Sequence, residues 1–92
     1  MPEVPKKYTL YQNHPNPFNP TTTISYALPR LSEATLSVYD MLGRQVNTLV
    51  SGAQAEGSYE VSFDASGLPS GVYLYRLRAG DFVIAKRMVV LK

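Results

Sequence analysis

Residues 13–29, "NHPNPFNPTTTISYALP", hold four of the chain's seven prolines and then continue into a segment in which polar and apolar residues alternate. Each proline fixes its own φ, lacks a backbone donor and moves the preceding residue out of the α region. Extended backbone is therefore predicted at His14, Asn16 and Asn19. The alternation after Pro20 predicts a β-strand that ends at Pro29. This segment can be a linker, a binding motif or the fixed entrance to a folded domain.

The rest of the chain repeats the strand pattern between closely spaced turns. Turn signals recur about every eight to twelve residues, and the segments between them alternate with period two. Seven strands are predicted, over residues 8–12, 22–28, 34–39, 45–50, 58–64, 72–78 and 82–91. Gly43 is predicted to supply a positive φ, and the polar stretch "SGAQAEG" (51–57) is predicted to be a loop. The sequence thus predicts an all-β fold, a seven-stranded antiparallel immunoglobulin-like β-sandwich.

Length and composition favour one small domain. The 92 residues are 45% hydrophobic and 17% charged, as is typical of a globular chain. Nine basic and seven acidic residues are scattered along the chain, so the net charge of +2 forms no basic block for nucleic acid. The sequence has no cysteine, no signal-peptide pattern and no apolar run long enough to span a membrane. We expect residues 1–7 to be the remains of an interdomain linker and residues 8–92 to be the folded domain.

Candidate catalytic and metal-binding residues are few. The single histidine, His14, lies beside a proline with no evident partner that would make it a general base. Asp40, Asp64 and Asp81 each fall at a predicted turn, where an Asp side chain bonds the backbone two residues on. They do not form a loop of calcium-binding spacing, although calcium binding stays open. We therefore expect no catalytic residue, no metal and no cofactor, and hence no enzyme.

The seven tyrosines suggest either core packing or a platform on which sugars stack. Four fall on predicted core faces: Tyr26, Tyr59, Tyr73 and Tyr75. The other three are candidates for exposed stacking: Tyr8, Tyr11 and Tyr39. Tyr73 follows the corner at residues 67–71, and its hydroxyl is predicted to bond back to the corner backbone. The alternative function is accordingly a carbohydrate-binding accessory β-sandwich module of a secreted glycosidase.

The last predicted strand is cationic at both ends, because Lys86, Arg87 and Lys92 bracket "MVVL" (88–91). Such charges blunt an edge strand against aggregation. They also suit a terminal tag that a partner recognises as an added strand or by its side chains. The residues alone leave these two interpretations open.

Four motifs follow one another along nearly the whole chain. They are "LYQNHPNPFNPTTTISYALP" (10–29), "LSVYDMLGRQVNTLV" (36–50), "GLPSGVYLYRL" (67–77) and "KRMVVLK" (86–92). In this order and spacing they resemble the type A C-terminal sorting domain of the type IX (Por) secretion system of Bacteroidetes-like bacteria. The order of the motifs makes the resemblance specific.

The resemblance implies a non-enzymatic sorting signal at the C-terminus of a larger secreted passenger protein. Its implied partners are the outer-membrane translocon, a sortase-like peptidase that removes the domain, and the N-terminal passenger. The implied location is the periplasm in transit, then the outer-membrane surface or the extracellular space. No membrane span or nucleic acid is implied, and a weak homodimer through the edge strands is left open.

The resemblance also assigns roles to residues. Translocon recognition is expected at Gly71, Tyr73, Lys86, Val89, Val90 and Lys92. Structural roles are expected at Pro15, Asn16, Pro17, Phe18, Pro20, Gly43 and Gly67. Of the residues expected in recognition, Gly71 and Tyr73 are expected to maintain the fold. The basic terminal strand is expected to be the part that the translocon recognises. The prolines are expected to fix where the chain enters the sandwich and to leave the upstream linker accessible to the peptidase.

Overall fold

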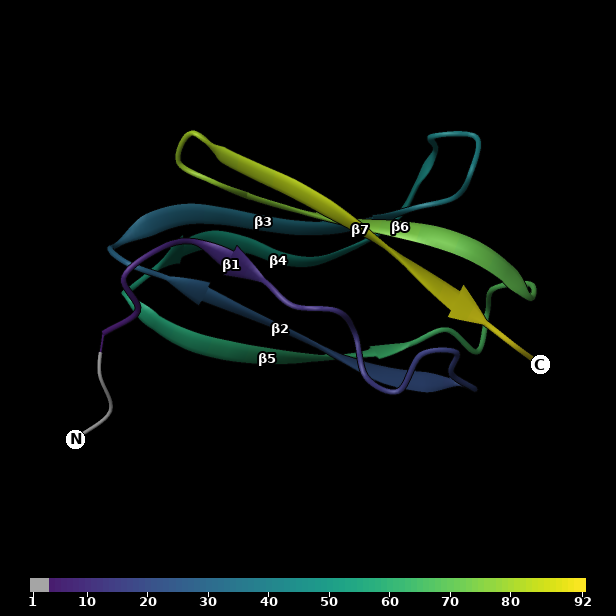
Figure 1. Ribbon diagram of the computed structural model, residues 1–92. Helices are drawn as coiled ribbons and strands as arrows, with labels where there is room; N and C mark the ends of the chain where they lie inside the picture. The colour runs from purple at the N-terminus through teal and green to yellow at the C-terminus, as the bar shows by residue number, and fades with distance from the viewer. Residues whose placement is uncertain (1–3) are drawn as a thin grey trace.

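Seven antiparallel strands form two sheets that stack face to face (Figure 1). The computed structural model describes residues 4–92, and no helix occurs in this range. The strands are β1 (Thr9–Leu10), β2 (Thr21–Leu28), β3 (Ser32–Tyr39), β4 (Gln45–Gln54), β5 (Gly57–Asp64), β6 (Gly71–Ala79) and β7 (Phe82–Val90). The predicted all-β sandwich of seven strands is thereby confirmed, and its layers are consistent with the immunoglobulin-like type.

Strands that follow one another in sequence often belong to different sheets. The smaller sheet has the order β1-β2-β5 and the larger one the order β4-β3-β6-β7. The β2–β5 ladder runs from Thr21 opposite Asp64 to Leu28 opposite Gly57. The β6–β7 ladder is a hairpin closed at Gly80, whose φ is +59°. Because the chain crosses repeatedly between the sheets, residues distant in sequence share one core.

Three strand boundaries differ from the predicted ones by more than one residue. The predicted loop at residues 51–57 is wrong, because β4 continues to Gln54 and pairs with β3 as far as Ser32. Small polar residues resemble a loop in sequence, but an edge strand exposed to water accepts them. β3 accordingly begins at Ser32 instead of residue 34, whereas β1 keeps only two of its five predicted residues.

The core fills the space between the sheets, and the long strands supply alternate residues to it. The buried apolar cluster consists of Leu10, Phe18, Ile24, Tyr26, Leu28, Ala34, Leu36, Val38, Phe63, Ala65, Tyr73, Tyr75, Leu77, Ala79, Met88 and Val90. The predicted core positions of Tyr26, Tyr73 and Tyr75 are confirmed. Tyr59 is half-buried, and its ring stacks on that of Tyr26 at 5.2 Å between centroids.

Two aspartates close turns as predicted. Asp40 Oδ1 accepts bonds from the backbone N–H of Leu42 at 2.9 Å and of Arg44 at 3.0 Å, and Gly43 has a φ of +83°. Asp64 Oδ1 accepts a bond from the Ser66 N–H at 2.8 Å. The bonds from Arg44 and Ser66 hold the pKa of Asp40 and Asp64, respectively, below the ordinary value of a carboxyl group. Both carboxylates therefore have a local structural role.

Candidate functional site

The proline-containing entrance segment (residues 13–20) links the smaller sheet to the edge of the larger one. At its start, His14 and Thr23 exchange two backbone hydrogen bonds of 2.9 Å. At its other end, the Phe18 N–H donates to Val89 O and the Leu91 N–H donates to Phe18 O, both at 3.0 Å. Three of its peptide bonds are cis: those before Pro15, Pro17 and Pro20. The segment is thus part of the folded domain, paired in parallel with the end of β7.

Buried polar groups anchor this segment. The Asn13 side chain is 2% exposed, and its Nδ2 donates to Thr22 Oγ1 at 3.0 Å and to Pro15 O at 3.1 Å. The Asn13 backbone N–H donates to the Tyr75 hydroxyl at 2.8 Å, and that hydroxyl donates to Tyr11 O at 2.8 Å. Burial raises the pKa of Tyr75 above its ordinary value. In residues 4–92 every buried side-chain nitrogen and oxygen has a partner, so the network is complete.

Two side chains cover the free edge of β7. Asn16 Oδ1 accepts a bond from the Val89 N–H at 2.9 Å. Gln12 Nε2 donates to Arg87 O at 2.7 Å. An uncovered edge strand is a template for pairing with another chain, and these contacts occupy part of its hydrogen-bonding groups. Together with Phe18, they fix the terminal strand against the entrance segment.

The C-terminal end of the chain meets the corner before β6. The Tyr73 hydroxyl donates to Pro69 O at 2.7 Å, which confirms the predicted bond to the corner backbone. The Lys92 N–H donates to Ser70 Oγ at 2.9 Å, and Lys92 Nζ donates to Ser66 O at 2.6 Å. Gly71 has a φ of +156°, a conformation that side chains rarely adopt. The corner therefore holds Lys92 in place.

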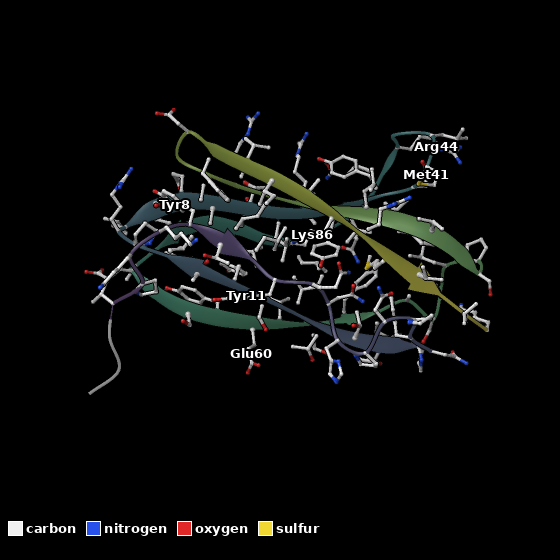
Figure 2. The ribbon with its side chains drawn as sticks, viewed as in Figure 1. Tyr8, Tyr11, Met41, Arg44, Glu60 and Lys86 are labelled. Atoms are coloured by element: carbon white, nitrogen blue, oxygen red, sulfur yellow. The ribbon has the colours of Figure 1, made fainter. Side chains whose placement is uncertain are left out.

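The residues expected to be recognised lie on different faces of β6 and β7. Tyr73 and Val90 face the core, at 6% and 0% exposure. Lys86 is on the same face of β7 as Val90 and is half-buried at the edge of the sandwich (Figure 2). Val89 points outward and is half-buried, and Lys92 is exposed. A partner that binds the folded domain can therefore contact Val89 and Lys92 directly, but it cannot contact Val90.

The other expected structural residues lie in turns or in the entrance segment. Phe18 is 3% exposed, and its ring meets Phe63 edge-on at 6.3 Å between centroids. Pro15, Pro17 and Pro20 are exposed, and Gly67 lies in the corner without a positive φ. The sequence reasoning missed Asn13, Thr22 and Gln12. A buried polar side chain has no signature in a pattern of alternation, because its burial depends on what the tertiary fold places over it.

The tyrosines proposed as a sugar platform do not form a continuous row. Tyr11 is 52% exposed, whereas Tyr8 donates or accepts a hydrogen bond with Ser32 at 2.8 Å and stacks on Phe82. Tyr39 lies on the outer face of the larger sheet, beneath Arg76. Among residues 4–92, no three His, Cys, Asp or Glu side chains are close enough together to hold a metal ion. The same residues contain no helix long and apolar enough to cross a membrane.

These contacts define a class of protein. It is a small β-sandwich in which the entrance segment and the C-terminal residues meet at the end of β7. Residues 12–91 match the family model described as secretion system C-terminal sorting domain. The chain therefore belongs to this family, whose members are sorting signals for type IX secretion. The searches of curated proteins and of solved structures found no match.

Family membership sets the general role of the domain. It is a C-terminal sorting signal from a family that is not catalytic, and it acts together with a passenger protein and a secretion machinery. The signal directs export toward the outer membrane or the extracellular surface. The match covers the entrance segment, the β3–β4 turn, the corner before β6 and β7.

Proposed function

We propose that the outer-membrane translocon recognises this domain in its folded state and that a sortase-like peptidase then cuts it from its passenger. The observation that supports folded recognition is the attachment of β7 at both its edge and its end. Releasing β7 as a free peptide would remove Met88 and Val90 from the core, where both are 0% exposed. Burial of each side chain stabilises the fold by about 1.5–3 kcal/mol. Recognition of β7 as a free peptide would therefore require this free energy to release it from the core.

In this proposal the residues of the terminal strand divide into two groups. Gly71, Tyr73 and Val90 maintain the corner and the core. Val89 and Lys92 contact the translocon directly, and Lys86 contributes positive charge from the edge of the sandwich. The exposed Leu91, at 54%, lies between the two direct contacts.

We propose that the peptidase cuts the chain just before the first contacts of the folded domain. Lys6 and Lys7 are exposed, whereas Tyr8 stacks on Phe82 at 5.1 Å between centroids and bonds to Ser32. A cut within residues 4–7 would leave the sandwich intact. We propose that residues 1–7 are the linker read by the peptidase and that residues 8–92 are the sorting domain.

The test fuses residues 1–92 behind a periplasm-directed fluorescent reporter. The reporter is measured outside the cell in a bacterium with a working type IX system and in a strain that lacks the translocon. Translocon-dependent release or surface display is expected. Retention of the folded, intact fusion in the periplasm of both strains would contradict the proposal and lead to a polysaccharide pull-down.

A matched pair of variants locates the contact on β7. Val89→Glu and Val83→Glu make the same change at opposite ends of one strand, both on its outward face. The first should reduce export of the reporter, and the second should not. Equal export of the two variants, with both shown to be folded, would place recognition away from the end of β7.

A further inference from the structure

Within residues 4–92, three arginines on the outer face of the larger sheet have no carboxylate partner. Arg76 and Arg78 extend outward from β6, and Arg87 extends outward from β7, because the alternate residues of both strands enter the core. In residues 4–92 the one ion pair joins Arg44 to Asp40, at 2.7 Å between Nε and Oδ2. The three guanidinium groups are therefore available to a partner.

The strand register brings these charges together. Arg76 lies opposite Ala85, and Arg87 lies two residues further along β7, opposite Leu74. Diagonal neighbours in an antiparallel pair are about 7–8 Å apart, and Arg78 follows Arg76 on the same face of β6 at a similar spacing. One short ligand can reach all three.

Arg76 is also held in position. Its guanidinium carbon lies 4.9 Å from the centroid of the Tyr39 ring, and Nη2 donates to the Tyr39 hydroxyl at 2.7 Å. Stacking on a ring leaves the remaining N–H groups of the guanidinium directed sideways. The group is thus prepared to bind a carboxylate without a further loss of side-chain freedom.

A hollow of about 240 Å³ opens beside Arg76, between the sheet and the β3–β4 hairpin. Its lining consists of Tyr39, Gly43, Leu74, Arg76 and Ala85. The exposed Met41 and Leu42 lie at the tip of the hairpin, at 59% and 77% exposure. The hollow is smaller than the roughly 300–1,000 Å³ of a small-molecule pocket, and it suits one bulky side chain.

Strands β2 and β5, which make up most of the smaller sheet, carry no basic residue, so the arginine cluster has no counterpart on them. The outer face of the smaller sheet carries Glu60 and Asp64 on β5, and Glu60 points away from the molecule there (Figure 2). On the face with the arginines, Asp40 is paired with Arg44, and Glu33 forms no ion pair within the described residues 4–92. The scattered basic residues of the sequence therefore form a local cluster only after folding.

We propose that this face binds an acidic polypeptide segment that carries one bulky apolar side chain. Carboxylates of the segment pair with Arg76, Arg78 and Arg87, and the apolar side chain fills the hollow. The proposal rests on the proposed function for the identity of the protein that carries the segment, a component of the secretion machinery. The binding itself is a property of the domain and is tested without export.

The β3–β4 hairpin and the sheet together offer a place for a chain segment. The β3–β4 hairpin rises above the plane of β6 and β7 (Figure 1), with Met41 and Arg44 on it (Figure 2). A polypeptide can lie in the angle between the hairpin and the sheet and contact both.

The experiment titrates the ¹⁵N-labelled 92-residue domain with synthetic peptides and follows its amide shifts by NMR. The probe is a capped Glu-Asp-Phe-Glu-Asp peptide, compared with the same peptide carrying Ser for Phe and with a version carrying Lys for each acid. We expect shifts centred on Leu74, Arg76 and Ala85 with the first peptide, weaker binding of the second and none of the third.

Charge reversal at the exposed Arg78 and Arg87 tests the cluster. R78E/R87E should weaken binding of the acidic peptide by at least about tenfold, because two charge-assisted contacts are lost. K6E/K7E makes the same change in net charge beside the smaller sheet and should alter the affinity by less than about twofold. Circular dichroism verifies that both variants are folded.

Three outcomes would overturn the proposal. The first is an equal loss of affinity in R78E/R87E and K6E/K7E, which would mean unspecific attraction. The second is a set of shifts spread over both sheets. The third is binding to anionic phospholipid vesicles with shifts at Met41 and Leu42 and no binding of the acidic peptide, which would make the face a lipid surface. None of these outcomes depends on whether the reporter fusion is exported.

Discussion

At the scale of single residues, Asn13 illustrates how one buried amide holds the entrance segment. Asn13→Ala would remove the donor to Pro15 O and Thr22 Oγ1. The expected loss is about 1–3 kcal/mol of unfolding free energy, since buried acceptors lose a partner. Asn47→Ala at an exposed position of β4 is the control and should change stability by less than about 0.5 kcal/mol. Urea denaturation measures the unfolding free energy of both variants. Equal unfolding free energies of Asn13→Ala and Asn47→Ala would contradict a structural role for the buried amide.

The two turn carboxylates predict a dependence of stability on pH. Hydrogen bonds lower the pKa of Asp40 and Asp64 in the folded state, so each stabilises the fold above its unfolded pKa of about 4. This contribution is lost as the pH falls through the folded pKa. The urea midpoint should therefore fall less between pH 7 and pH 3 in D40N/D64N than in the wild type. Glu60→Gln, exposed on β5, is the control, and an undiminished fall in the double variant would refute the assignment.

At the scale of elements, the end of β7 depends on Phe18. Phe18→Ala removes a ring that is 3% exposed and should cost about 3–5 kcal/mol. Hydrogen exchange should then accelerate first at Val89 and Leu91, whose amides bond to the entrance segment. Phe82→Ala at the other end of β7 is the comparison, and it should leave the exchange rates of the Val89 and Leu91 amides unchanged. Uniform acceleration in both variants would show that the entrance segment does not fix the strand locally.

The strand boundaries show which strand ends follow from the alternation of polar and apolar residues and which depend on pairing with a neighbouring strand. Alternation predicted β5 and β6 to within one residue at either end, because each has one face in the core. It failed at residues 51–54, where β4 continues because β3 supplies hydrogen-bond partners to a polar edge. It also predicted too long a β1, because that strand lies at the edge of the smaller sheet and pairs there with β2.

At the scale of the whole molecule, truncation of the terminal strand is predicted to unfold the domain. Deleting residues 88–92 removes Met88 and Val90 from the core, a loss of about 1.5–3 kcal/mol for each side chain. Small domains have only about 5–15 kcal/mol of total stability. Deleting only Leu91 and Lys92, both exposed, should leave the sandwich folded. Circular dichroism checks both truncations, and a folded domain without residues 88–92 would contradict the predicted dependence on β7.

This prediction changes how export experiments on truncations are interpreted. Loss of export on deleting residues 88–92 would be expected from unfolding alone. Outward substitutions such as Val89→Glu leave the core intact and can separate recognition from stability. Export experiments should therefore substitute residues of β7 that point outward, because changes at its buried residues also unfold the domain.

The sequence by itself determined the β-sandwich class, most strand positions, the tyrosine corner at Tyr73 and the family, because period-two alternation and turn residues are local properties. The tertiary structure alone decided that Asn13 is buried, that Lys86 lies on the inner face of β7 and Val89 on the outer face, and that the arginines of β6 and β7 form one cluster. These features depend on register and on which sheet each strand joins. Contacts between residues far apart in the chain set both, and no local pattern contains them.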